Sequence, residues 1–281
     1  MPKEGFHLFL ADRHRDCRRS EGRPAGPVEN EWPAFCLGAI SPDIFFYDLP
    51  SFALGRLGDS LHELVEQKGL APIEHWLQNY PGKIPPDVAA WGLGFASHVL
   101  ADGIWHPAIN DLSASLSFCR HSRLSSLDCH RLIECEMEAY WPPQEGKQTG
   151  WYVDFLKMVN EGGQLLARAS RNYREFLSSA GLQPICGEAR ITRCYRNQNR
   201  MLRLFANPFL RKRRDSLMDV RAGRFLASLI IPDRAVLPSG YIPEIPPGRD
   251  PFSPEFQRKG IISLNSRLSD FAERLAQYLP S

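Results

Sequence analysis

Apolar residues recur at steps of three and four along most of the chain, whereas strictly alternating apolar and polar runs are scarce. Because a helix turns once in about 3.6 residues and a strand alternates every two, this pattern predicts an all-α protein. We expect about eight helices on this periodicity. The best-defined ones lie near residues 32–37, 57–67, 87–109, 127–141, 151–177, 191–205, 208–230 and 255–279.

Glycines and prolines interrupt the helical pattern at two places. Gly162-Gly163 is expected to kink or split the fifth helix, because each glycine weakens a helix by about 1 kcal/mol relative to alanine. Residues 232–254 hold seven of the 23 prolines, which predicts an extended tether. We therefore expect one all-α domain over residues 1–281, with a first half to residue 145, a helical half over 146–231, the tether, and a C-terminal helix over 255–281.

The C-terminal helix has one apolar stripe that needs a partner. Its members recur at helical spacing and are Ile261, Leu264, Leu268, Phe271, Leu275 and Tyr278. Such a face is buried either against the body of the same chain, which we favour, or against a partner chain.

Composition places the chain among ordinary globular proteins. Apolar residues make up 43% and charged residues 23%, which excludes a disordered or collagen-like chain. Lys and Arg number 34 against 32 Asp and Glu, so net charge does not indicate a nucleic-acid or membrane-surface partner. The longest apolar stretch, residues 88–101, contains His98 and is shorter than the roughly 20 residues that span a bilayer, so we expect no transmembrane segment.

The start of the chain and the cysteines bear on the compartment. The first residues have Glu4 and His7 where a secretory signal needs an unbroken apolar stretch, so we expect no signal peptide. Seven cysteines are an odd number without CxxC spacing, which favours reduced thiols over a disulfide framework or a thiolate zinc site. Both features predict a cytoplasmic protein.

Histidines and carboxylates gather in the first half of the chain. His98, Asp102 and His106 stand at i, i+4 and i+8 on the third helix and share one face, and the next helix carries His130 and Glu134 at i and i+4. At 1.5 Å per residue, His98 and His106 lie about 12 Å apart, too far for one ion with bonds of about 2 Å. Asp102 could instead bridge two ions, so the pattern predicts a polynuclear metal site.

Each of these groups could instead have a structural role with no metal bound. A single His/Asp pair on a helix is usually solvated or hydrogen-bonded, but residues 88–109 are apolar nearly all round, and buried polar groups need partners. Metal ions would supply those partners. Asp43 follows Pro42 at a helix end, where a carboxylate could be a ligand or equally a cap or turn residue. His62 lies on a short amphipathic helix and could be a surface or core histidine.

The ordered set of motifs resembles one known family. The set comprises His7, Ser41-Pro42-Asp43, His62, His98-x-x-x-Asp102-x-x-x-His106 and His130-x-x-x-Glu134, and it spans residues 1 to about 141. It resembles the zinc-dependent phospholipase C family, which shares an all-helical fold and a trinuclear zinc site with fungal single-strand nucleases. The resemblance implies one zinc ion held by Asp43, His62, His98 and Asp102, and a second held by His106, His130 and Glu134. Asp102 would also bridge toward a third ion, held further by His7.

The chain departs from this family at the third zinc. In the family that ion is completed by the amino group and carbonyl of an N-terminal tryptophan, whereas the first tryptophan here is Trp32. We therefore expect two zinc ions, with a third that is weaker if it binds. The residues over 1–145 then form the metal-site half of the protein.

The resemblance also implies a reaction. Adjacent zinc ions polarise a phosphoryl oxygen and activate water, so we expect hydrolysis of a phosphodiester, with a phospholipid as the favoured partner and Asp43 assisting as the catalytic base. One alternative is a single-strand nuclease-like phosphodiesterase that acts on nucleic acid. The other is a non-catalytic helical protein that binds metal or a partner.

Several further residues have two interpretations each. Phe45, Phe46 and Tyr47 could wall a pocket or belong to the core. The run from Arg211 to Arg214 could bind anionic lipid or nucleic acid, or form a solvated face. Glu138 could orient a ligand or face solvent. The remaining histidines, which match no motif and are interpreted as structural or surface residues, are His14, His75 and His121.

Overall fold

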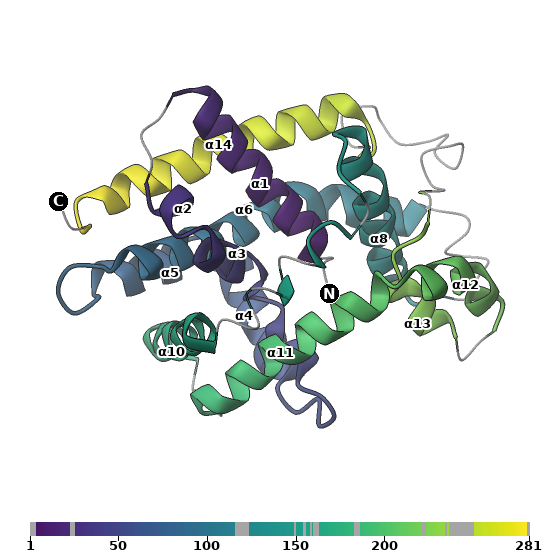
Figure 1. Ribbon diagram of the computed structural model, residues 1–281, viewed down its shortest axis with the longest axis horizontal. Helices are drawn as coiled ribbons and strands as arrows, with labels where there is room; N and C mark the ends of the chain where they lie inside the picture. The colour runs from purple at the N-terminus through teal and green to yellow at the C-terminus, as the bar shows by residue number, and fades with distance from the viewer. Residues whose placement is uncertain are drawn as a thin grey trace.

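The structure is a computed structural model that describes residues 4–22, 26–115, 124–148, 150–153, 156–157, 159, 163–182, 186–220, 223–233, 235 and 250–279. Within these ranges every regular element is helical, which confirms the all-α prediction (Figure 1). The first half contains α1 (Glu4–Ser20), α2 (Pro27–Asn30), α3 (Trp32–Ile40), the 3-10 helix η1 (Ile44–Tyr47), α4 (Gly55–Lys68), α5 (Ala71–Gln78), α6 (Pro86–Ser115) and α8 (Ser126–Gln144). The second contains α10 (Gly163–Ser179), α11 (Glu188–Phe205), α12 (Pro208–Asp219), α13 (Arg224–Leu229) and α14 (Pro254–Ala276).

Helices α3 and α6 make the closest backbone approach relevant to the site. A Cβ atom added to Gly38 would collide with the carbonyl oxygen of Trp91, and one added to Gly94 would collide with the carbonyl oxygen of Phe35. Only glycine at both positions lets the two backbones meet in this way. The crossing brings the turn that follows α3 against the middle of α6, where His98 lies.

Aromatic packing holds α6 from the other side. The rings of Phe95 and Phe176 lie 4.8 Å apart, and those of Trp76 and Trp91 lie 5.5 Å apart. All four side chains belong to one core that extends from α1 to α14. Helix α6 is thus fixed around residues 91–95 by α5, α10 and α3.

The C-terminal helix α14 packs on the body of the chain, as the apolar stripe predicts. Leu264, Leu268, Phe271 and Leu275 are buried, and α14 contacts α6, α1 and α5. Figure 1 shows α14 crossing α1 on one side of the molecule. The indole of Trp105 on α6 donates a hydrogen bond of 3.0 Å to the Gln257 side chain, which ties α14 to the helix that carries the site.

Several helices differ from the sequence prediction. Helix α1 was not predicted because its buried face includes His7, Asp12 and His14, which interrupt the apolar pattern. Helix α5 was not predicted because eight residues are too few to show a period. The single helix predicted over 208–230 is instead divided into α12 and α13, because the chain is extended at Val220.

Two predicted breaks fall partly outside the described residues. Helix α10 begins at Gly163, and residues 153, 156, 157 and 159 before it are also helical, while Gly162, where a kink or split is expected, lies outside the described residues. Most of the predicted tether over 232–254 also lies outside them. Among the helices that the structure describes, none is long and apolar enough to cross a membrane.

The cysteines depart from the expectation at one residue. Cys17, Cys36, Cys135, Cys186 and Cys194 are free thiols. Cys129, near the start of α8, is disulfide-bonded, so the expectation of reduced thiols does not hold at this position. Cys119 lies outside the described residues.

Candidate metal centre

Three groups of side chains bring their ligand atoms within 4.8 Å of one another. The inner group is His7, Asp43 and His98, the outer group is His106, His130 and Glu134, and a third group, His62, His98 and Asp102, lies beside the inner one. Together they contain all eight residues that the sequence proposed as ligands. These residues come from α1, the turn after α3, α4, α6 and α8.

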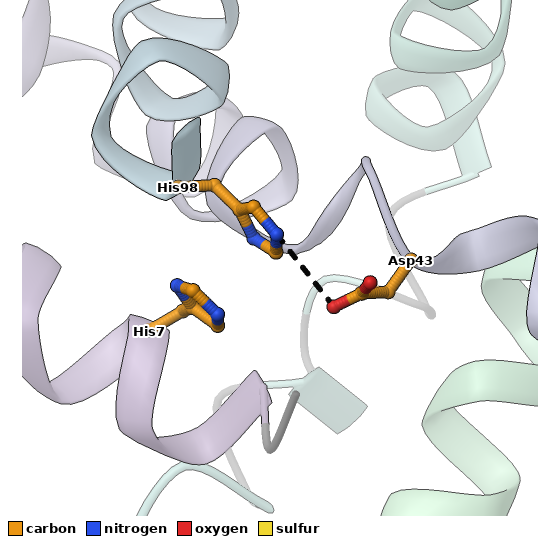
Figure 2. Close-up of side chains that lie close together, drawn as sticks. All are labelled: His7, Asp43 and His98. Atoms are coloured by element: carbon orange, nitrogen blue, oxygen red, sulfur yellow. Dashed lines mark ion pairs between the residues drawn. The ribbon is translucent and has the colours of Figure 1, made fainter. Parts of the chain in front are cut away.

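The inner group is almost completely buried. His7, Asp43 and His98 have 4%, 0% and 1% of their surface exposed, and Figure 2 shows them converging from α1, the turn after α3, and α6. The rings of His7 and His98 stack 3.8 Å apart, and His98 Nε2 lies 3.8 Å from Asp43 Oδ2. His62 on α4 approaches the other oxygen, with Nε2 3.1 Å from Asp43 Oδ1. Asp43 stands at the start of η1 but its side chain makes no cap hydrogen bond, so its carboxylate is directed at the histidines.

Asp102 lies between the inner and outer groups. Its Oδ2 is 3.2 Å from His98 Nε2, whereas its Oδ1 is 3.2 Å from His106 Nε2 and 3.3 Å from His7 Nε2. The two oxygens therefore face different histidines, which is the arrangement that a bridging carboxylate needs.

The outer group joins α6 to α8. Glu134 Oε1 is 3.0 Å from His130 Nε2 and 3.4 Å from His106 Nε2. The side chains of His106 and His130 are 28% and 14% exposed, so this group reaches the surface while the inner group does not.

Three of the histidines are oriented through their second ring nitrogen. The Nδ1 atom of His98 lies 2.8 Å from the carbonyl oxygen of Ala39, that of His62 lies 2.9 Å from the carbonyl oxygen of Gly58, and that of His130 lies 2.8 Å from the amide oxygen of Asn110. Since a carbonyl oxygen can only accept, Nδ1 carries the hydrogen in each case. The Nε2 lone pair then faces the centre, as in metal-binding histidines.

The donor atoms fit zinc. Both oxygens of Asp43 and Nε2 of His62, His98 and His106 are buried without a hydrogen-bond partner, although each lies near an oppositely charged group. Two atoms bound to one tetrahedral zinc ion at about 2.1 Å are separated by about 3.4 Å. The observed separations run from 3.0 to 3.8 Å. The pair at 3.0 Å, His130 Nε2 and Glu134 Oε1, also has hydrogen-bond geometry. The atoms of Asp43, His62, His98 and His106 lie at these distances without it, as the ligands of shared ions would.

The carboxylates make the centre strongly attractive to positive charge. Burial of His98 works to lower its pKa, but the charges of Asp102 and Asp43 outweigh it and raise the pKa to about 9. Burial of His106 is outweighed in the same way by Asp102 and Glu134, which raise its pKa to about 9. The histidines hold the pKa of both Asp102 and Glu134 below the usual range, although burial works to raise it. Protons and metal ions would therefore compete for this centre.

His7 and His62 respond differently to the same surroundings. Burial and the nearby His98 lower the pKa of His7. For His62, burial acts in the lowering direction, but the carboxylate of Asp43 raises the pKa. His7 is therefore held neutral, in the form that binds metal.

Residues with two interpretations are now placed. Glu138 is buried and accepts a hydrogen bond of 2.6 Å from the Tyr152 hydroxyl, so the solvated-face interpretation is wrong. Phe45 and Tyr47 are buried in the core, while the Phe46 ring lies 5.6 Å from that of His62.

Two unmatched histidines and the basic run are explained by local contacts. His14 bonds Asn265 and His75 bonds Asn79, while His121 lies outside the described residues. Arg214 is buried and forms an ion pair of 2.6 Å with Glu136, so the run that starts at Arg211 is not one solvated face.

A cavity of about 470 Å³ opens beside the centre. Its wall includes His62, Asp102 and His106, together with Asn110 on α6 and Arg267 on α14. Neither Asn110 nor Arg267 is predicted from the sequence as a site residue. Asn110 stands four residues after His106, as His106 does after Asp102, so this helical spacing indicates that all three share one face of α6.

Comparison with known protein families gives a match over more than half of the chain. The family described as zinc-dependent phospholipase C matches residues 7–179, a segment that contains all eight candidate ligands. No curated protein and no solved structure matches the chain.

Proposed function

Because the chain belongs to the zinc-dependent phospholipase C family, we propose that its centre binds two zinc ions, with a weaker third, and that it cleaves a phospholipid diester. Members of this family hydrolyse phosphodiester bonds of phospholipids. The observation that carries the proposal is the convergence of eight histidine and carboxylate side chains from five segments of the chain. In a hydrogen-bond network that only stabilises the fold, buried nitrogen and oxygen atoms would be paired with one another. Here, several of these atoms are buried without a hydrogen-bond partner.

The proposed ligands follow the groups of side chains. Asp43, His62, His98 and Asp102 would hold one zinc ion. The outer group, His106, His130 and Glu134, would hold a second. The third would lie next to His7, with Asp102 as a further ligand. Ligand atoms of His7, Asp43 and His98 also lie within 4.8 Å of one another, so Asp43 would be a further candidate ligand next to His7.

Asp43 and two histidines have separate roles in the proposed reaction. Zinc, when bound, supplies a Lewis acid that polarises a phosphoryl oxygen and lowers the pKa of water. Asp43 is fully buried beside two histidines, and one of its carboxylate oxygens would receive the proton that the attacking water loses. His98 and His62 are held by backbone carbonyls, so they would keep their Nε2 atoms in place while the substrate enters.

The cavity supports a small diester group as the part of the substrate that is recognised. About 470 Å³ corresponds to the lower part of the range for drug-sized ligands. That volume suits a phosphate with its headgroup, while two long acyl chains would remain outside. Phospholipid therefore stays the favoured substrate, and single-stranded nucleic acid is an outcome for the experiment to decide.

The experiment measures zinc and hydrolysis on the same preparation. Elemental analysis should find at least two zinc ions per chain, and phosphatidylcholine vesicles and an aryl phosphodiester should be cleaved. A chelator should abolish cleavage and added zinc should restore it. His98→Ala should lose both zinc and activity. His75→Ala removes an exposed histidine outside the three groups and is the matched control.

The alternatives give different results. Cleavage of single-stranded DNA with intact phosphatidylcholine would favour the nuclease-like function. Zinc-loaded protein that cleaves none of the three substrates would favour a non-catalytic metal-binding protein.

A further inference from the structure

One cation in the cavity wall has no role in the centre as described. Arg267 on α14 lines the cavity with His62, Asp102 and His106, and no other lysine or arginine lines it among the residues that the structure describes. It is exposed and forms no ion pair with any residue in the described ranges. Its neighbours Leu264 and Leu268 are buried, so the backbone at Arg267 is fixed on the body of the molecule.

Neither acidic residue of the cavity neutralises this guanidinium. Asp102 directs both oxygens at histidines, at 3.2 to 3.3 Å. Glu66, one turn after His62 on α4, also lines the cavity, but it forms no ion pair within the described part of the chain. Arg267 is thus an uncompensated positive charge facing the space beside the candidate ligands.

A guanidinium fits one part of a phosphodiester. Its planar fork of N–H groups matches two oxygens of a phosphate group, and such charge-assisted pairs are among the strongest hydrogen bonds in proteins. A metal ion would be repelled by the same charge, so Arg267 is not suited to the metal side of the site. The α14 helix lies outside the matched residues 7–179, so family membership does not account for it.

We propose that Arg267 binds the non-bridging oxygens of the substrate phosphate and holds the diester against the metal centre. This inference rests on the proposed function and adds a substrate-binding residue to it. Arg267 would act mainly on binding, because its contact forms with the phosphate before any bond is broken. The C-terminal helix therefore takes part in the site as well as in the core.

The test uses full-length, zinc-loaded protein with inorganic phosphate and a headgroup-free aryl phosphodiester. Arg267→Gln should weaken phosphate binding, measured by calorimetry, by at least about tenfold and should raise KM for the diester by a similar factor. The phosphate affinity of Arg267→Lys should fall between those of wild type and Arg267→Gln, because lysine retains the positive charge but lacks the planar fork of N–H groups. Zinc content and melting temperature should not change. Lys259→Gln removes a charge from an exposed position of the same helix and should behave as wild type.

The results separate this inference from the proposed function. Wild-type phosphate affinity and KM in Arg267→Gln would overturn it. An effect confined to lipids with anionic headgroups would also overturn it, because Arg267 would then recognise the headgroup. If no diester is cleaved by wild type but Arg267→Gln still weakens phosphate binding tenfold, the proposed function fails and the phosphate-binding role stands.

Discussion

The inner and outer groups of the centre are held in place by different means. The inner histidine His98 bonds the main-chain carbonyl of Ala39, and its helix meets α3 at two glycines. The outer histidine His130 bonds the side chain of Asn110 and is 14% exposed. One group is positioned by backbone and burial, the other by side chains near the surface.

This difference has a consequence for affinity. Side chains that are fixed before the ion arrives lose less freedom when they bind it. We therefore expect the inner end of the centre, which is the inner group, to bind zinc more tightly. The outer end, which is the outer group, should exchange zinc more readily. Asp102, which faces both groups, should couple the two ends.

The largest effect is expected when Asp102 is changed, because it serves both ends. Asp102→Asn should lower zinc content by more than one equivalent and abolish diester hydrolysis. Elemental analysis and an activity assay measure both. Asp87→Asn, near the start of the same helix and paired with Arg168, is the control and should retain full zinc. Loss of a single ion would mean that Asp102 is a ligand of one ion only, and unchanged zinc would remove it from the site.

The next effect concerns the helix crossing that positions the inner group. Gly94→Ala places a methyl group against the carbonyl of Phe35, so α3 must move away from α6. We expect the free energy of unfolding, measured by chemical denaturation, to fall by about 1–3 kcal/mol, as is typical of overpacked positions. Zinc affinity should fall more at the inner end than at the outer.

A second glycine on α6 provides the control. A Cβ added to Gly103 meets nothing within 4 Å, so Gly103→Ala should leave the crossing intact and stabilise the helix by about 1 kcal/mol. If both variants behaved alike, the close approach of α3 and α6 would not be what holds the inner group.

The sequence predicts those parts of the centre that depend on one helix at a time. The spacing of His98, Asp102 and His106 predicts their shared face, because helical geometry is local. The approach of Asp43 to His98 depends on how α3 crosses α6, and no periodic pattern reveals that a glycine on each helix lies against the backbone of the other helix. The place of Arg267 in the site is still harder to predict from the sequence, because Arg267 lines the cavity only once α14 has packed on the body of the chain.

The resemblance supplied what periodicity could not in one case. His7 lies on α1, a helix that the apolar pattern missed because its polar residues are turned inward. The buried polar residues of α1 interrupt its apolar pattern, and one of them, His7, belongs to the site. Such a mismatch between pattern and burial is expected at functional sites.

A smaller effect should separate the outer end from the inner. Asn110→Ala removes the acceptor that orients His130, and loss of such a partner typically weakens metal affinity by about tenfold to one hundredfold. A zinc titration followed by calorimetry should show one weakened site and one unchanged site. Asn79→Ala removes a similar contact to His75, outside the three groups, and should change neither. Equal weakening of both sites would contradict the separation between the two ends.

The smallest effect is on stability against pH, and it compares the centre with and without metal. Without zinc, the pKa of His98 and His106 is raised to about 9 from 6.5, so their charged forms stabilise the fold. That stabilisation is complete below about pH 6.5 and is lost as the pH rises through about 9. We expect the melting temperature of chelator-treated protein to fall over this interval. Zinc-loaded protein should not show the decline, because metal then occupies the nitrogens that would bind protons. Parallel declines in both forms would mean that these histidines do not exchange protons for metal.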